Sequence, residues 1–394
     1  MMSKDMPEIR FKSFTNAWEL RKFNSIVNRI STQSNVDYLP KIEFEDIISG
    51  EGQLNKDISN KFDGRKGIYF EPNNILYGKL RPYLKNWLFA DFKGIALGDF
   101  WVFEANNSSP IFDYYLIQNE KYQEVANLST GTKMPRSDWK TVSETRFFIP
   151  MEILEQTAIG NFFRTLDDLL TLHKRKLEGL KELKRGYLQQ MFPQKGERIP
   201  RVRFDGGTGD WKEYKLSEMT DYMNGKGHED KQSESGRYEL VNLNSISIDG
   251  GLKHSGKFID NAVETLIEND LVMILSDVGH GNLLGRVALI PENNKFVLNQ
   301  RVALLRVKKS VNPYFLFSFI NVNQQYFKLH GAGMSQLNIS KSSVENFPSF
   351  VPTLLEQTSI GNFFRNLDNQ ISAQNKKLNQ LKKLKSAYLQ KMFI

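Results

Sequence analysis

Residues 154–192 read LEQTAIGNFFRTLDDLLTLHKRKLEGLKELKRGYLQQMF, and residues 355–393 read LEQTSIGNFFRNLDNQISAQNKKLNQLKKLKSAYLQKMF. The two stretches align at a constant offset of 201 without a gap, and they are identical at 23 of 39 positions. A repeat of about 200 residues is too long for a solenoid unit or a propeller blade. The sequence therefore predicts two domain-sized halves, each followed by one copy of this segment.

Apolar residues recur every three to four positions in both copies, which predicts one long helix per copy. The predicted seam comprises Ile159, Phe163, Leu166, His173, Leu180 and Tyr187 in the first copy, and Ile360, Phe364, Leu367, Gln374, Leu381 and Tyr388 in the second. His173 and Gln374 are equivalent and central, so antiparallel packing would bring the two polar layers opposite each other. A helix of 39 residues is about 58 Å long, which suits a spacer.

Further features of the copies concern helix stability. The apolar stripe also includes Leu169 and Leu183. The first copy has Gly179 and Gly186 where the second has Gln380 and Ala387, and each glycine costs about 1 kcal/mol in a helix. Thr353 and Glu356 form an expected capping box before the second copy, whereas the first has no Ser or Thr cap. The first helix is therefore expected to need tertiary support.

Composition limits the class of protein. The chain has 394 residues, of which 40% are hydrophobic, so two to three domains with buried cores are expected. Cysteine is absent, which excludes disulfides and thiolate metal sites and fits a reducing cytoplasm. The sequence shows neither a signal peptide nor an apolar run long enough to span a membrane. The net charge of +8 favours a polyanionic partner.

The duplication extends beyond the helices. Residues 9–22 and 202–215 share a pattern of residue types at an offset of 193, whereas the interiors that follow share little sequence. Short runs bounded by turn residues predict strands at residues 67–69, 75–77, 94–97, 100–103, 271–275, 286–290, 296–298 and 302–307, and residues 111–127 and 313–329 are expected to be helical. We predict an α+β protein with similar domains at 1–150 and 194–350, in which 194–210 is a linker, and long antiparallel helices at 151–193 and 351–394.

Catalytic signatures are absent or incomplete. Gly279, Gly281 and Gly285 miss the dinucleotide-binding spacing by one residue. Residues 312–314 read NPY, which fits a turn that opens a helix better than a methyltransferase signature. The chain contains no P-loop sequence, and its histidines lack metal-ligand spacing. We therefore expect no catalytic residue, no metal site and no cofactor in this chain.

Basic and amide side chains interleaved with aromatic ones mark the interiors. Arg, Asn and Gln can contact base edges through two hydrogen bonds, whereas Lys mostly neutralises phosphate. The candidate DNA-binding residues are Lys79, Arg81, Tyr83, Lys85, Lys133 and Arg136 in the first half, and Lys226, His228, Arg237, His280, Asn282, Arg286, Gln300, Arg301, Gln336 and Asn338 in the second. A solvated surface charge is the alternative explanation for each of them taken singly.

Two variable halves framed by the repeated pattern LEQ...IGNFF..LD......KL..LK..K..YLQ.MF resemble the specificity subunit of a Type I restriction-modification system, over the whole chain. The resemblance implies two target recognition domains that each read one part of a bipartite double-stranded DNA site. It also implies antiparallel helices that separate these domains and dock two methyltransferase subunits, with restriction subunits as possible further partners. S-adenosylmethionine, ATP and magnesium would then belong to the partners.

Two other functions remain compatible with the residues alone. A stand-alone nucleic-acid-binding regulator could share the two-domain architecture, and it would copurify with no methyltransferase. A coiled-coil scaffold would show no salt-sensitive binding to a duplex.

Overall fold

The computed structural model describes residues 6–128, 133–194, 196–204, 207, 209–278 and 281–394. Two compact units divide the chain: residues 1–174 with 376–394 form the first, and residues 175–375 form the second. Each unit thus contains one α+β domain and one half of each long helix. The predicted four-part division follows the ends of the helices instead, and it stays a prediction.

The first unit begins with a mainly β domain and continues into a long helix. Its elements are β1 (Glu19–Lys22), η1 (Phe23–Ser25), β2 (Val27–Ile30), β3 (Gln33–Ser34), β4 (Lys41–Ile42), η2 (Phe44–Asp46), β5 (Ile47–Ile48), β6 (Gln53–Leu54), β7 (Gly67–Phe70), β8 (Ile75–Gly78), η3 (Pro82–Leu84), β9 (Trp87–Phe89), β10 (Gly94–Ala96), β11 (Phe100–Ala105), α1 (Pro110–Leu116), α2 (Glu120–Ala126), α3 (Trp139–Glu144), β12 (Arg146–Ile149) and the start of α4 (Ile153–Gln190).

Two four-stranded sheets form the core of this domain. One has the order β2-β11-β8-β9 and is antiparallel, and the other has the order β3-β7-β10-β4 with a parallel β10–β4 pair. Side chains alternate along β11, so Trp101 and Phe103 pack in one cluster with residues of α1 and α2, while Phe100 and Val102 pack against the second sheet. The central sheet is therefore buried on both faces, which explains its continuous apolar strands.

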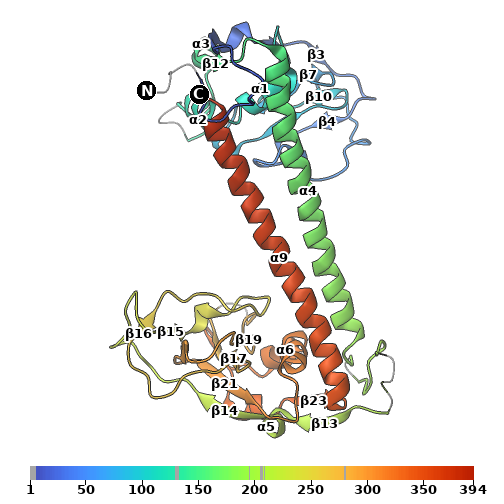
Figure 1. Ribbon diagram of the computed structural model, residues 1–394. Helices are drawn as coiled ribbons and strands as arrows, with labels where there is room; N and C mark the ends of the chain where they lie inside the picture. The colour runs from blue at the N-terminus through green and yellow to red at the C-terminus, as the bar shows by residue number, and fades with distance from the viewer. Residues whose placement is uncertain (1–5, 129–132, 195, 205–206, 208, 279–280) are drawn as a thin grey trace. The chain divides into compact units, whose positions relative to one another are not determined.

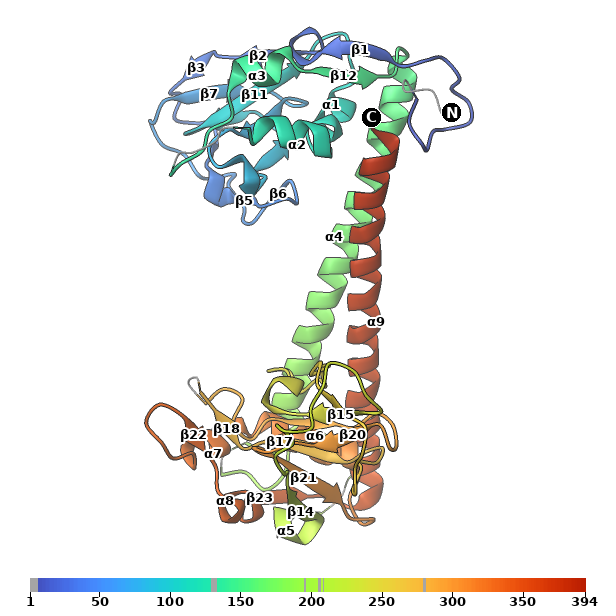
Figure 2. The same ribbon diagram turned by 90° about the vertical axis from the view of Figure 1, so that its left-hand side faces the viewer.

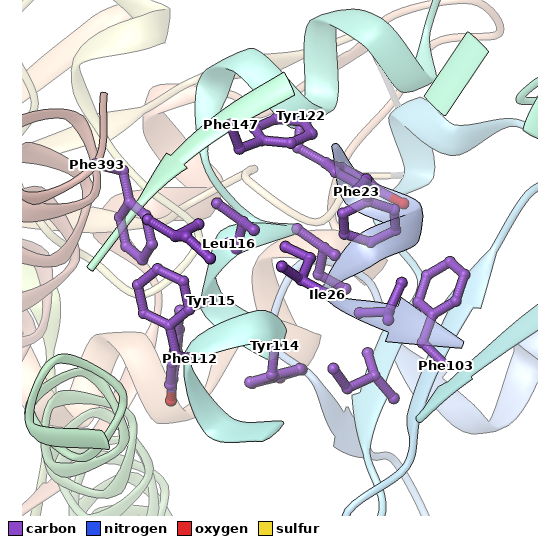
Figure 3. Close-up of a cluster of buried hydrophobic side chains, with 14 of the residues drawn as sticks. Phe23, Ile26, Phe103, Phe112, Tyr114, Tyr115, Leu116, Tyr122, Phe147 and Phe393 are labelled. Atoms are coloured by element: carbon purple, nitrogen blue, oxygen red, sulfur yellow. The ribbon is translucent and has the colours of Figure 1, made fainter. Parts of the chain in front are cut away.

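The helical side of this core also receives the end of the second long helix. Phe393 directly follows α9 (Leu354–Met392), and its ring centroid lies 5.4 Å from that of Phe112 in α1 and 5.8 Å from that of Phe163 in α4 (Figure 3). Phe112 and Phe163 are fully buried. The last residues of the repeat thus complete the core of the first domain.

The second unit repeats this plan. After the end of α4 its elements are β13 (Lys212–Lys215), α5 (Leu216–Met219), β14 (Thr220–Asn224), β15 (Tyr238–Val241), η4 (Leu243–Ser245), β16 (Phe258–Ile259), β17 (Leu271–Ile274), β18 (Ser276–Asp277), β19 (Val287–Leu289), β20 (Phe296–Leu298), β21 (Val302–Val307), α6 (Pro313–Val322), α7 (Gln324–Leu329), β22 (Leu337–Asn338), α8 (Lys341–Glu345), β23 (Pro348–Val351) and the start of α9.

The strand order confirms that the interiors share a fold although they share little sequence. The main sheet has the order β14-β21-β17-β19, which matches β2-β11-β8-β9 strand for strand. The β13–β23 pair matches β1–β12, and the parallel β15–β20 pair matches β4–β10. The expected strands are present within one or two residues. Each expected late helix is divided in two, because α1 ends at Leu116 and Asn119 caps α2, and because Asn323 interrupts the helix between α6 and α7.

Within each unit the two long helices run antiparallel (Figure 1). In the first unit Phe162 of α4 contacts Tyr388 of α9, and Lys385 lies 2.6 Å from Asp167. In the second unit Tyr187 contacts Phe363, and Lys184 lies 2.6 Å from Asp368 in the equivalent ion pair. The start of each helix therefore lies beside the end of the other.

All residues of the predicted seam are at least partly buried, and their role as one continuous seam stays a prediction. Ile159, Phe163, Leu166, Ile360, Phe364, Leu367, Gln374 and Leu381 are buried, and His173, Leu180, Tyr187 and Tyr388 are partly buried. Leu169 and Leu183 were wrongly included in the stripe, because they are 38% and 46% exposed on the outer face. His173 and Gln374 both take part in interactions, and their mutual pairing stays a prediction.

The LEQ residues of the repeat have the same partners in both units. Glu155 accepts two hydrogen bonds from Arg10, at 2.6 and 2.7 Å, and Glu356 accepts two from Arg203, at 2.8 and 2.7 Å. Only one of the two hydrogen bonds of the expected capping box is present, in which Glu356 N–H lies 3.4 Å from Thr353 Oγ1. The prediction is wrong for the other, because the Glu356 carboxylate binds Arg203 instead. Within the described part of the chain, no helix combines the length and apolar character that a bilayer crossing requires.

Candidate nucleic-acid interface

The six candidate residues of the first domain gather where three segments meet. We call this place corner 1 and define it as residues 79–85, the turn at 98–99 and residues 133–137. The N–H of Lys79 donates to Asp99 O at 2.9 Å, that of Arg81 to Pro135 O at 2.7 Å, and that of Ser137 to Lys79 O at 2.8 Å. Backbone hydrogen bonds thus hold the three segments together at the ends of β8, β10 and the α2–α3 connection.

Corner 1 presents mostly cationic and aromatic side chains to solvent. Arg81, Tyr83, Lys85, Lys133 and Arg136 are exposed. An acidic residue organises part of this surface: Asp99 lies 2.9 Å from Arg136 Nη2 and 3.6 Å from Lys79 Nζ. A patch of this kind can neutralise phosphates and contact base edges.

The second domain has a corner built by equivalent hydrogen bonds. Corner 2 comprises residues 275–278, the turn at 299–301 and residues 336–339. Leu275 N–H donates to Arg301 O at 2.9 Å, and Ile339 N–H donates to Leu275 O at 3.0 Å, as Lys79 and Ser137 do in the first domain. The bridge between Leu80 and Arg136 corresponds to the pairing of Ser276 with Asn338. Arg301 is therefore the structural counterpart of Asp99, and Asn338 that of Arg136.

Most candidates of the second domain lie in or beside corner 2. Gln300, Arg301, Gln336 and Asn338 belong to it. Lys226 forms a bridge with Asn299, and His228 follows in the same loop, whose Glu229 accepts a hydrogen bond from Gln300. Asn282 accepts from Lys328 at 3.3 Å, next to β22 and β18, which with α7 form one edge of this domain (Figure 2).

Two candidates lie elsewhere, and the placement of a third is not described. Arg286 is half-buried, donates to Asn321 O at 3.0 Å, and has a pKa lowered by burial, so its guanidinium contributes to packing on α6. Arg237 is exposed and stacks on Tyr238, with 5.1 Å from Cζ to the ring centroid, outside the hydrogen bonds that define corner 2. His280 lies outside the described residues.

Two arginines occupy a backbone conformation that L-residues rarely adopt. Arg81 has φ of 50° and Arg301 has φ of 61°. A left-handed conformation at a non-glycine residue costs of order 1–3 kcal/mol and concentrates at functional sites. Both arginines lie outside regular strands, in the bend or turn that their corner contains.

A cleft of about 730 Å³ in the first unit borders corner 1 at Lys85 but differs from the corners in the character of its other walls. Its walls come from the 49–53 loop, α2 and the two long helices, and they carry charges of both signs. Lys174 pairs with Glu51 at 2.8 Å and Lys385 with Asp167 at 2.6 Å, so much of the positive charge is already neutralised. The cleft therefore lacks the electrostatic character of a phosphate-binding groove.

The sequence analysis did not select Asp99 or Ser276, which contact the candidate residues Arg136 and Asn338. An acidic residue in a basic stretch and a serine at the end of a strand give no signal for DNA contact on their own. Only their position in the chain could have pointed to them, because both lie immediately beside strands that recur in the two halves. Recognising it required the strand order, since the interior sequences do not align.

Comparisons with known proteins agree with this architecture. The family model for the Type I restriction modification DNA specificity domain matches residues 18–182 and again 208–383. The Type I restriction enzyme MjaVIII specificity subunit of Methanocaldococcus jannaschii is 22% identical over 314 residues, which is 76% of this chain and 73% of that protein. This chain belongs to the family of Type I restriction-modification specificity subunits, with two copies of its DNA specificity domain.

Solved structures share the fold at low sequence identity. The S subunit of a Type-I restriction-modification system from M. genitalium has a TM-score of 0.66 at 15% identity, over 99% of both chains. A chain from a structure that describes complex assembly and conformational transition of the type I R-M system has a TM-score of 0.54 at 18% identity, over 94% of this chain and 96% of that one. These likenesses extend over both domains and both long helices.

Proposed function

We propose that this chain is the DNA-reading subunit of a Type I restriction-modification complex, in which each domain reads one half of a bipartite, asymmetric site. The observation that carries the proposal is the pair of corners. They have the same backbone hydrogen bonds and strand order, yet they present different side chains, such as Arg136 in one and Asn338 in the other. Two corners with equivalent backbones and different exposed side chains suit the recognition of two different half-site sequences.

Exposed leucines on the long helices support docking of two methyltransferase subunits. Leu154 and its counterpart Leu355 are 75% and 81% exposed, and Leu183 and its counterpart Leu384 are 46% and 42% exposed. Apolar side chains left in solvent at equivalent positions of a repeat are expected where a partner covers them twice. The structure related to this chain that describes assembly of the type I R-M system is in keeping with such partners.

We further propose that methyl transfer and cleavage belong to the partners. S-adenosylmethionine would bind to the methyltransferase subunits, and ATP and magnesium to restriction subunits if these are present. This chain would contribute double-stranded DNA binding and the spacing of the half-sites, without a catalytic centre of its own. The absence of cysteine is consistent with action in a reducing cytoplasm.

The test is selection of duplexes from a random library by the chain copurified with the methyltransferase encoded in its source genome. We expect enrichment of two short sequences separated by a gap of constant length, and methylation of adenine or cytosine within them only when the methyltransferase is present. The chain alone should methylate nothing. Selection without any enriched sequence would contradict the proposal, and sequence-specific binding without a copurifying methyltransferase would favour a stand-alone regulator.

A further inference from the structure

We propose that Arg136 is a guanine-reading residue of the first domain and that Asp99 positions it. The inference rests on the proposed DNA-reading function and adds which base is read, by which side chain and from which corner. Arg136 pairs with Leu80 in a β-bridge and is exposed, with 57% of its side chain accessible. It therefore extends from a rigid part of corner 1 into solvent.

The geometry of the ion pair leaves the guanidinium edge that reads guanine available. Arg136 Nη2 donates to Asp99 Oδ2 at 2.9 Å and Nε to the same oxygen at 3.3 Å. A guanidinium has five N–H donors, so three remain, including both on Nη1. Guanine presents two acceptors, O6 and N7, side by side in the major groove, which an arginine fork can engage with two parallel hydrogen bonds.

Asp99 is held in place independently of Arg136. Its backbone carbonyl accepts from Lys79 N–H at 2.9 Å, and its carboxylate lies 3.6 Å from Lys79 Nζ. A positioned carboxylate reduces the number of arginine rotamers, so less side-chain entropy is lost when the base is bound. A carboxylate within the proposed DNA-binding surface repels phosphate and so weakens binding to every duplex. Its presence there therefore points to a role in base selectivity.

The counterpart in the second domain has no guanidinium at the Arg136 position. Asn338 takes this place, and its Oδ1 accepts from Ser276 Oγ and from Gln336 Nε2. The acid is replaced as well, because Arg301 stands where Asp99 stands in the first domain. The arginine–aspartate pair thus belongs to one half-site, so its loss should alter only that half.

A purely structural role is the competing explanation. The pair could fasten the 98–99 turn to residues 133–137 as an exposed ion pair, and such pairs contribute little to stability. Base preference separates the two roles, because loss of a pair that only fastens the turn leaves the order of preferred bases unchanged.

The experiment compares selected sites for the chain in its methyltransferase complex, using wild type, Arg136→Ala, Arg136→Lys and Asp99→Asn. Arg136→Ala should lose about 5- to 150-fold of the preference for guanine at one position of one half-site. Arg136→Lys should not restore it, because an ammonium lacks the fork. Asp99→Asn should weaken the same preference while it raises affinity for random duplexes, since a negative charge is removed.

Matched variants provide the controls. Arg65 is likewise exposed and paired with carboxylates, those of Asp63 and Glu43, outside corner 1, so Arg65→Ala should leave both half-sites unchanged. Lys85→Ala should weaken all duplexes alike and flatten the salt dependence by about one unit. Asn338→Ala should alter only the other half-site.

The outcomes are separable. If wild type selects no sequence, the proposed function fails. If wild type selects a bipartite site and Arg136→Ala keeps every base preference, the assignment of Arg136 is wrong although the function stands. A changed preference for a base other than guanine also overturns it, and an unchanged preference in Asp99→Asn removes the positioning role of Asp99.

Discussion

At the scale of single residues, Asp113 shows how burial determines a protonation state. The side chain lies on α1 with 0% exposure, and burial raises its pKa well above the usual range. Ser108 Oγ lies within hydrogen-bond distance of both Asp113 Oδ2 and Ile26 O. A hydroxyl has one hydrogen, so both contacts are satisfied when a protonated Asp113 donates to Ser108 and Ser108 donates to Ile26. We therefore predict that Asp113 is protonated in the folded protein, since burial raises its pKa.

We therefore expect the stability of Asp113→Asn, relative to that of wild type, to increase as pH rises. A carboxyl whose pKa is raised by folding stabilises the fold below the unfolded pKa of about 3.9 and loses that contribution as pH approaches the folded pKa. The free energy of unfolding of Asp113→Asn minus that of wild type should thus increase, by at most about 1.4 kcal/mol per pH unit. Urea titrations between pH 4 and 8 measure this difference. Parallel pH profiles for the two proteins would show that Asp113 is ionised in the folded state.

Residue-level predictions from sequence depend on the signal that the residue type itself carries, and the DNA-binding role of the candidate residues stays a prediction. Basic and amide residues near turns were found, and the structure brings the six of the first domain into one corner. Asp99 could not be found in this way, because its proposed role depends on Arg136, which lies 37 positions along the chain. Arg286 gave a false signal of surface charge, since the position of α6 decides that its side chain is half-buried.

At the scale of elements, residues that are identical in the two copies of the repeat make equivalent contacts in the two units. Gln156 accepts from Ser109 N–H at 2.8 Å, and Gln357 accepts from Asn312 N–H at 2.9 Å, so each glutamine fastens a long helix to the start of α1 or α6. Gly160 permits a close approach between α4 and α1, because a Cβ there would lie 2.5 Å from Ile111 Cγ2. The repeated residues therefore hold helix to domain as well as helix to helix.

Two other glycines of α4 have no such neighbours, and replacing them should stabilise the protein. A Cβ at Gly179 or Gly186 would meet nothing within 4 Å among the described atoms. Gly179→Ala and Gly186→Ala should each raise the free energy of unfolding by about 0.5–1 kcal/mol, because alanine loses less backbone entropy in a helix. Chemical denaturation measures the gain. Gly160→Ala is the matched comparison and should lose about 1–3 kcal/mol through overpacking; equal effects at all three positions would contradict this explanation.

Strands and helices were largely predictable because their signals are local. Turn residues bound the short apolar runs, and the repeat has a clear helical period. The order β2-β11-β8-β9 and the parallel β10–β4 pair were not predictable, because pairing joins segments far apart in sequence. The breaks at Asn119 and Asn323 were missed because apolar residues continue on both sides of each asparagine.

At the scale of the whole molecule, the proposed function implies that the length of the long helices determines the distance between the two half-sites. Inserting one heptad after His173 and one after Gln374 adds about 10 Å while it keeps the apolar seam in register. The two half-site sequences should be retained, and the gap between them should grow by up to about three base pairs at 3.4 Å each. Selection of bound duplexes measures the gap. A single insertion should behave worse because it shifts the seam, and an unchanged gap after both insertions would show that spacing is set elsewhere.

The duplicated fastening of the long helices also bears on chain order. In the second unit Val202 N–H donates to Gln190 O at 3.0 Å, and a short covalent connection joins these residues. In the first unit the equivalent bond runs from Ile9 N–H to Lys391 O at 3.0 Å, between residues at opposite ends of the numbering. A chain in which the second domain and its long helix preceded the first could form the same two hydrogen bonds, so neither bond depends on the order of the two halves.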